Sequence, residues 1–82
     1  MFDNLKETIA AAESILSDVK WSKESAEQSV QYWTDKRNEF KAENPDEDDS
    51  YYLSNLNEAN IKVKMYNAIE KTITEFVRQA LK

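Results

Sequence analysis

The chain has 82 residues, a mass of 9.6 kDa and a net charge of −5 from 11 basic and 16 acidic side chains, with no Gly, no Cys and no His. These absences exclude disulfide scaffolds, thiolate metal sites and glycine-rich phosphate loops, and they remove the commonest general base. The acidic balance argues against direct binding of nucleic acid or anionic membranes, which require positive charge. We therefore expect a non-enzymatic protein without cofactor or metal.

The location of the protein is predicted from the absence of a membrane span and of a signal peptide. No apolar run approaches the roughly 18 residues of a membrane span, and residues 1–7 lack the layout of a signal peptide. We expect a cytoplasmic protein with no membrane partner. At this size a folded chain hides only about 63% of its surface, so the single domain, residues 1–82, would have a thin core.

Residues 2–43 carry an apolar repeat in steps of three and four, which is typical of helices packed in a bundle or coiled coil. Its members are Phe2, Leu5, Ile9, Ala12, Leu16, Val19, Lys23, Ala26, Val30, Trp33, Arg37 and Phe40. No alternation typical of strands is present, so the fold class is predicted to be all-α. Ser22 could cap a new helix, which would place a break near Trp21.

Residues 44–50 combine turn-forming and acidic side chains. Asn44 followed by Pro45 and Glu47 is one candidate helix start, and Asp49 with Ser50 is another. The turn does not match the Ca²⁺-binding loop of an EF-hand, because Asp49 and Asn55 stand where that loop requires Gly and Glu. A solvated turn is the simplest interpretation of these carboxylates.

Residues 50–81 repeat the same spacing. The members are Tyr52, Leu56, Ala59, Val63, Tyr66, Glu70, Ile73, Val77 and Ala80. If the two repeats pack antiparallel with residue numbers that sum to 96, Phe40 lies beside Leu56, and Lys23 and Glu70 fall in adjacent layers where they can form an ion pair. The tighter alternative sums to 89.

Two architectures fit these repeats. The preferred one is a small antiparallel bundle of three helices, about 2–19, 22–43 and 50–81. The alternative is a long two-helix hairpin that dimerises, with a second copy covering the N-terminal overhang.

Side chains outside the repeats are the candidate partner-binding residues. Exposed Trp and Tyr are favoured as anchors in protein contacts, and a helix with apolar residues on a second face packs on a second neighbour. The set comprises Trp21, Tyr32, Tyr51, Ile61, Met65, Ile69 and Phe76, together with the acidic group Asp46, Glu47, Asp48 and Asp49.

The predicted function is that of a protein-interaction module, which binds and occludes a partner protein as a small inhibitor, adaptor or assembly factor. Phage and mobile elements often encode acidic helical regulators of this size, which is an analogy only. One alternative is a nucleic-acid mimic, whose acidic turn would occupy the basic site of a DNA- or RNA-binding protein such as a host defence complex. Another is a structural coiled-coil homodimer.

Overall fold

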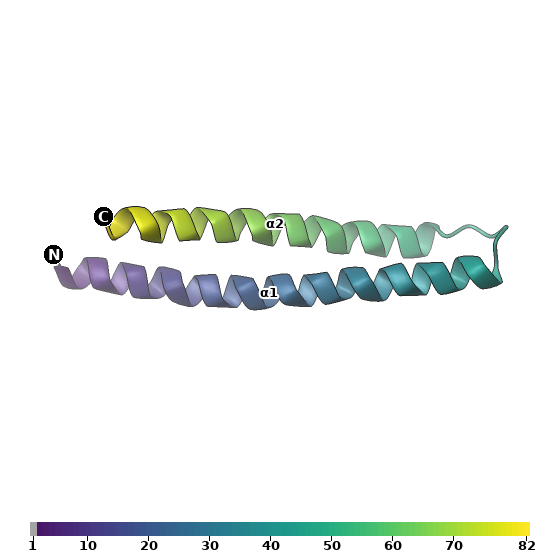
Figure 1. Cartoon of the computed structure of the whole chain (residues 1–82), viewed down its shortest axis with the longest axis horizontal. Helices are drawn as coiled ribbons and strands as arrows, with labels where there is room; N and C mark the ends of the chain where they lie inside the picture. Colours follow the sequence, from purple (N-terminus) through teal and green to yellow (C-terminus); the bar gives the residue numbers. More distant parts are fainter. Residues whose placement is uncertain (1) are drawn as a thin grey trace.

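The protein is a long helical hairpin (Figure 1). The computed structural model describes the backbone of residues 2–82 and the side chains of residues 4–82. Helix α1 spans Phe2–Glu43, helix α2 spans Ser50–Ala80, and the two run antiparallel, joined by the turn at residues 44–49. The rod measures 64 × 15 × 14 Å. The all-α class is confirmed.

The predicted bundle of three helices is wrong, because residues 2–19 and 22–43 belong to one uninterrupted helix. A serine in place of alanine lowers helix stability by only about 0.5 kcal/mol, and no Gly or Pro interrupts the segment. Moreover, α2 is long enough to cover α1 back to about Ala12, so most of residues 12–19 already have a partner. The overhang that remains extends beyond the end of α2 (Figure 1). In it Leu5 is exposed, while the side chain of Phe2 lies outside the described residues.

The register of the hairpin lies between the two predicted ones. Lys23 Nζ is 3.5 Å from Glu70 Oε2, and the ring centroids of Phe40 and Tyr52 are 4.9 Å apart. Facing residues therefore have numbers that sum to about 92 or 93, and the predicted contact of Phe40 with Leu56 is wrong by one helical turn. The predicted ion pair between Lys23 and Glu70 is confirmed.

The core between the helices is very small. Among the described residues only Ala26 and Ala59 are buried, at 6% and 4% exposure. Large seam residues such as Val30, Trp33 and Val63 are half-buried. Each helix has only one neighbour, so only a small side chain directly between the two backbones can be fully enclosed.

The turn end of the hairpin is held by rings and charges. Trp33 contacts Tyr52 with 6.4 Å between ring centroids, next to the contact of Tyr52 with Phe40. Helix α1 ends where the backbone N–H of Asn44 donates to the carbonyl of Phe40, 2.8 Å away. Helix α2 begins at Ser50, which confirms the second of the two candidate starts and shows that Asn44 does not cap it.

Candidate functional site

Helix α2 exposes a row of large apolar side chains away from α1. This apolar strip consists of Ile61, Met65, Ile69 and Phe76, whose exposures lie between 40% and 57%. At 100° per residue the four side chains fall within about 80° of the circumference of α2. The hairpin thus leaves uncovered a second apolar face of α2, which spans about four helical turns.

Two shallow grooves meet beside this strip. One, of about 620 Å³, follows α2 and is lined by Leu53, Ile61, Lys62 and Met65, among others. The other, of about 180 Å³, runs between the helices. Its lining residues are Trp21, Ser22, Ser25, Ala26, Ser29, Lys62 and Tyr66. Because Lys62 borders both grooves, the strip and Trp21 lie on the same side of the hairpin.

Trp21 is the most exposed large apolar side chain among residues 4–82, at 72%. Next to it Ser22, Ser25 and Ser29 present small side chains toward the inter-helix groove. We missed these serines in the sequence, although their spacing of three and four residues on one flank of α1 was visible. Small side chains allow a further helix to approach closely, with Trp21 standing at the edge.

Tyr32 and Tyr51 occupy a different place from Trp21. Both rings meet Trp33 edge-on, with centroid distances of 5.1 and 5.9 Å, and Lys36 Nζ lies 5.7 Å from the centroid of Tyr32. Both tyrosines remain exposed. The predicted aromatic anchors therefore divide into Trp21, beside the inter-helix groove, and two tyrosines in a ring cluster near the turn.

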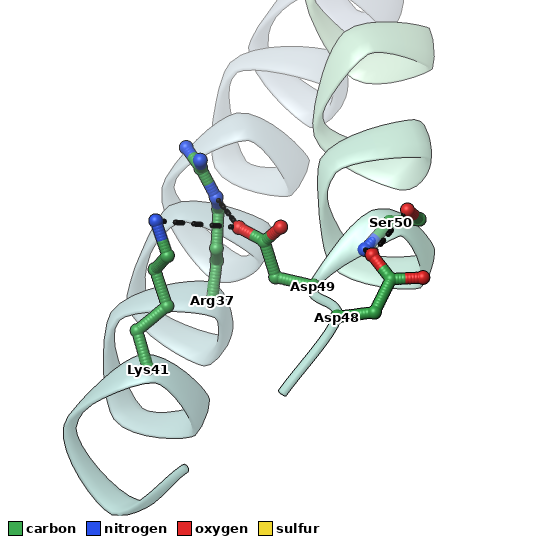
Figure 2. A network of polar contacts seen from close by, with 5 residues as sticks. All are labelled: Arg37, Lys41, Asp48, Asp49 and Ser50. Carbon is green, nitrogen blue, oxygen red and sulfur yellow. Dashed lines mark hydrogen bonds and ion pairs between the residues drawn. The ribbon is translucent and has the colours of Figure 1, made fainter. Parts of the chain in front are cut away.

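The acidic turn is partly neutralised within the chain. Figure 2 shows Asp49 facing Arg37 and Lys41, with its Oδ2 atom 2.7 Å from Arg37 Nε and 3.6 Å from Lys41 Nζ. The hydrogen bond from Arg37 holds the pKa of Asp49 below its usual value. Sequence reasoning missed this contact, because it depends on the register of the hairpin.

The other three carboxylates of the predicted acidic group do not take part in the contact with Arg37 and Lys41. Asp48 accepts hydrogen bonds from the backbone N–H of Ser50, at 3.0 Å, and from its hydroxyl (Figure 2). Asp46 and Glu47 are exposed. Among the side chains of residues 4–82, no three carboxylates converge on a position that could hold a metal ion. The four acids therefore do not form one uniform patch.

Comparison with protein-family models, curated proteins and solved structures finds no match for this chain. Neither α1 nor α2 contains a stretch long and apolar enough to cross a lipid bilayer. The surface of the hairpin is therefore the feature that bears on function.

Proposed function

We propose that the protein is a non-enzymatic interaction module that binds a partner protein through the apolar strip of α2 and occludes or bridges that partner. The observation that carries the proposal is the row Ile61, Met65, Ile69 and Phe76, exposed on a helix whose other face already packs on α1. Isolated exposed apolar residues are ordinary on protein surfaces, but a continuous row of them marks an interaction site.

The shape of the strip favours a helical segment as its ligand. From Ile61 to Phe76 the strip is about 22 Å long at 1.5 Å per residue, which matches four turns of an amphipathic helix. The groove beside Leu53 and Met65 extends it toward the turn. Covering the exposed half of each large apolar side chain contributes about 1 kcal/mol, so the four residues together supply about 4 kcal/mol. A specific complex also needs contacts at the groove and along the rim of the strip.

Affinity capture from the native cell with matched variants tests this proposal. Ile69→Asp places a carboxylate in the strip, and we expect it to lose the captured partner. Asn67→Asp is the control, since it adds the same charge to the same helix about 160° away. Equal capture by wild type and both variants would overturn the proposal. Loss of capture in a variant with Asp46→Asn and Glu47→Gln, but not in Ile69→Asp, would assign binding to the turn.

A further inference from the structure

We infer that the occupant of the apolar strip is a second copy of this chain, packed antiparallel on the first across a two-fold axis that passes Ile69. Four helices then surround a common core. The inference rests on the proposed function in one respect, since both require the strip to be an interaction surface. It adds the identity of the protein that covers the strip.

The exposed area of the hairpin matches what a dimer needs to bury. The chain exposes 6403 Å², whereas a compact chain of 9.6 kDa exposes about 5,100 Å². The excess of about 1,300 Å² exceeds the roughly 800 Å² that each partner buries in an interface of standard size. An interface of that size would leave about 5,600 Å² exposed per chain, which is closer to the value for a compact chain.

The strip is also complementary to itself. A two-fold interface requires that residues at equal distances on either side of the axis fit one another. Ile61 lies eight residues before Ile69 and Phe76 lies seven residues after it, while Met65 lies between Ile61 and the axis. In the dimer Ile69 therefore meets the partner's Ile69, while each end of the strip meets the opposite end of its copy.

The axis falls near the middle of the rod. Glu70, next to Ile69, pairs with Lys23 of α1, and Lys23 lies about 32 Å along α1 from Phe2 at 1.5 Å per residue. This is half of the 64 Å length of the hairpin. Two hairpins related by this axis overlap along their whole length, so that neither leaves a long unpaired segment.

Charge favours the antiparallel orientation. Each chain carries a net charge of −5 and an acidic turn that includes Asp46, Glu47 and Asp48. A parallel dimer would place two such turns side by side, whereas the antiparallel one keeps them at opposite ends of the rod. Like charges that face one another across an interface disfavour that arrangement.

Single-cysteine variants provide the experiment, because the chain has no cysteine of its own. Ile69→Cys places two thiols on the two-fold axis, and we expect mild oxidation to convert most of the chain into a disulfide-linked dimer. Asn67→Cys is the control on the far side of α2 and is expected to remain unlinked. At about 100 µM, well above a micromolar Kd, wild type is expected to sediment with twice the mass of the chain.

The outcomes separate this inference from the proposed function. A wild type that sediments as a monomer overturns the dimer, and so does a dimer in which Asn67→Cys links and Ile69→Cys does not. Affinity capture tests the proposed function separately. If wild type is monomeric and captures a partner that Ile69→Asp does not capture, the proposed function is still supported. Should Ile69→Asp fail to fold, the cysteine variants still decide the matter.

Discussion

Replacing Lys23 and Glu70 by methionine, singly and together, tests how much the ion pair of the hairpin seam stabilises the fold. Their charged atoms are 3.5 Å apart and each side chain is 26% exposed. At this distance the Coulomb energy is about 1.2 kcal/mol in water and about 4.7 kcal/mol at an effective dielectric constant of 20. Partial desolvation and loss of side-chain freedom offset most of it, so we expect a coupling energy of about 1 kcal/mol.

The assay is urea denaturation followed by far-ultraviolet circular dichroism, at one protein concentration for all variants so that any association affects them equally. We expect each single variant to lose about 0.5 kcal/mol of unfolding free energy, because the remaining charge is half-buried without its partner. The double variant should be about as stable as wild type, as a coupling energy of about 1 kcal/mol requires, since methionine suits an apolar seam.

The exposed pair Lys36–Glu39 is the matched control, with the same N···O distance of 3.5 Å but side chains that are 44% and 65% exposed. Its coupling should stay below about 0.5 kcal/mol. In 1 M salt the coupling of Lys23 with Glu70 should persist in part, because a half-buried pair is screened less than a surface pair. Single variants whose effects add without coupling would refute the reasoning.

Three other substitutions test the packing, the turn and the helix start. Ala59→Leu should lose about 1–3 kcal/mol of unfolding free energy, because Ala59 is enclosed between the helices. Its control is Ala10→Leu on the exposed surface, which should change the unfolding free energy by less than about 0.5 kcal/mol in the same urea titration. The lowered pKa of Asp49 predicts that the Arg37 contact stabilises the fold above pH 4, and that this stabilisation is lost as the pH falls through the lowered pKa. Asp49→Asn should therefore flatten the decline in melting temperature between pH 5 and pH 2. An unchanged decline would contradict a stabilising role of the contact between Asp49 and Arg37. Asp48→Ala removes the carboxylate that accepts from the backbone N–H and the hydroxyl of Ser50, the first residue of α2. It should lower stability by about 1 kcal/mol, which thermal denaturation measures.

The seven-residue repeat was sufficient to predict an all-helical antiparallel structure, because the apolar spacing is a local property of the sequence. The repeat did not predict that α1 is a single uninterrupted helix. Ser22 permits a helix to start, but whether it does depends on whether residues 12–19 find a partner, and α2 provides one. The register also depends on long-range contacts, such as that of Phe40 with Tyr52, which a repeat compatible with several alignments does not determine.

The candidate site was predictable where it depends on the period of a single helix. Ile61, Met65, Ile69 and Phe76 lie outside the repeat of α2, and the structure leaves all four exposed. The neutralisation of Asp49 by Arg37 was not predictable, since the two residues meet only in the observed register.

The arrangement of contacts along the hairpin gives folding a direction. Near the turn Trp33 and Tyr52 meet after a short loop closes, whereas Ala12 and Ala80 face one another only once nearly the whole chain is in place. Closing the longer loop first would cost about 1 kcal/mol more in chain entropy. We therefore expect helix pairing to start at the ring cluster and to proceed toward the termini. Amide-hydrogen exchange should then be slowest near Trp33 and fastest at the open end.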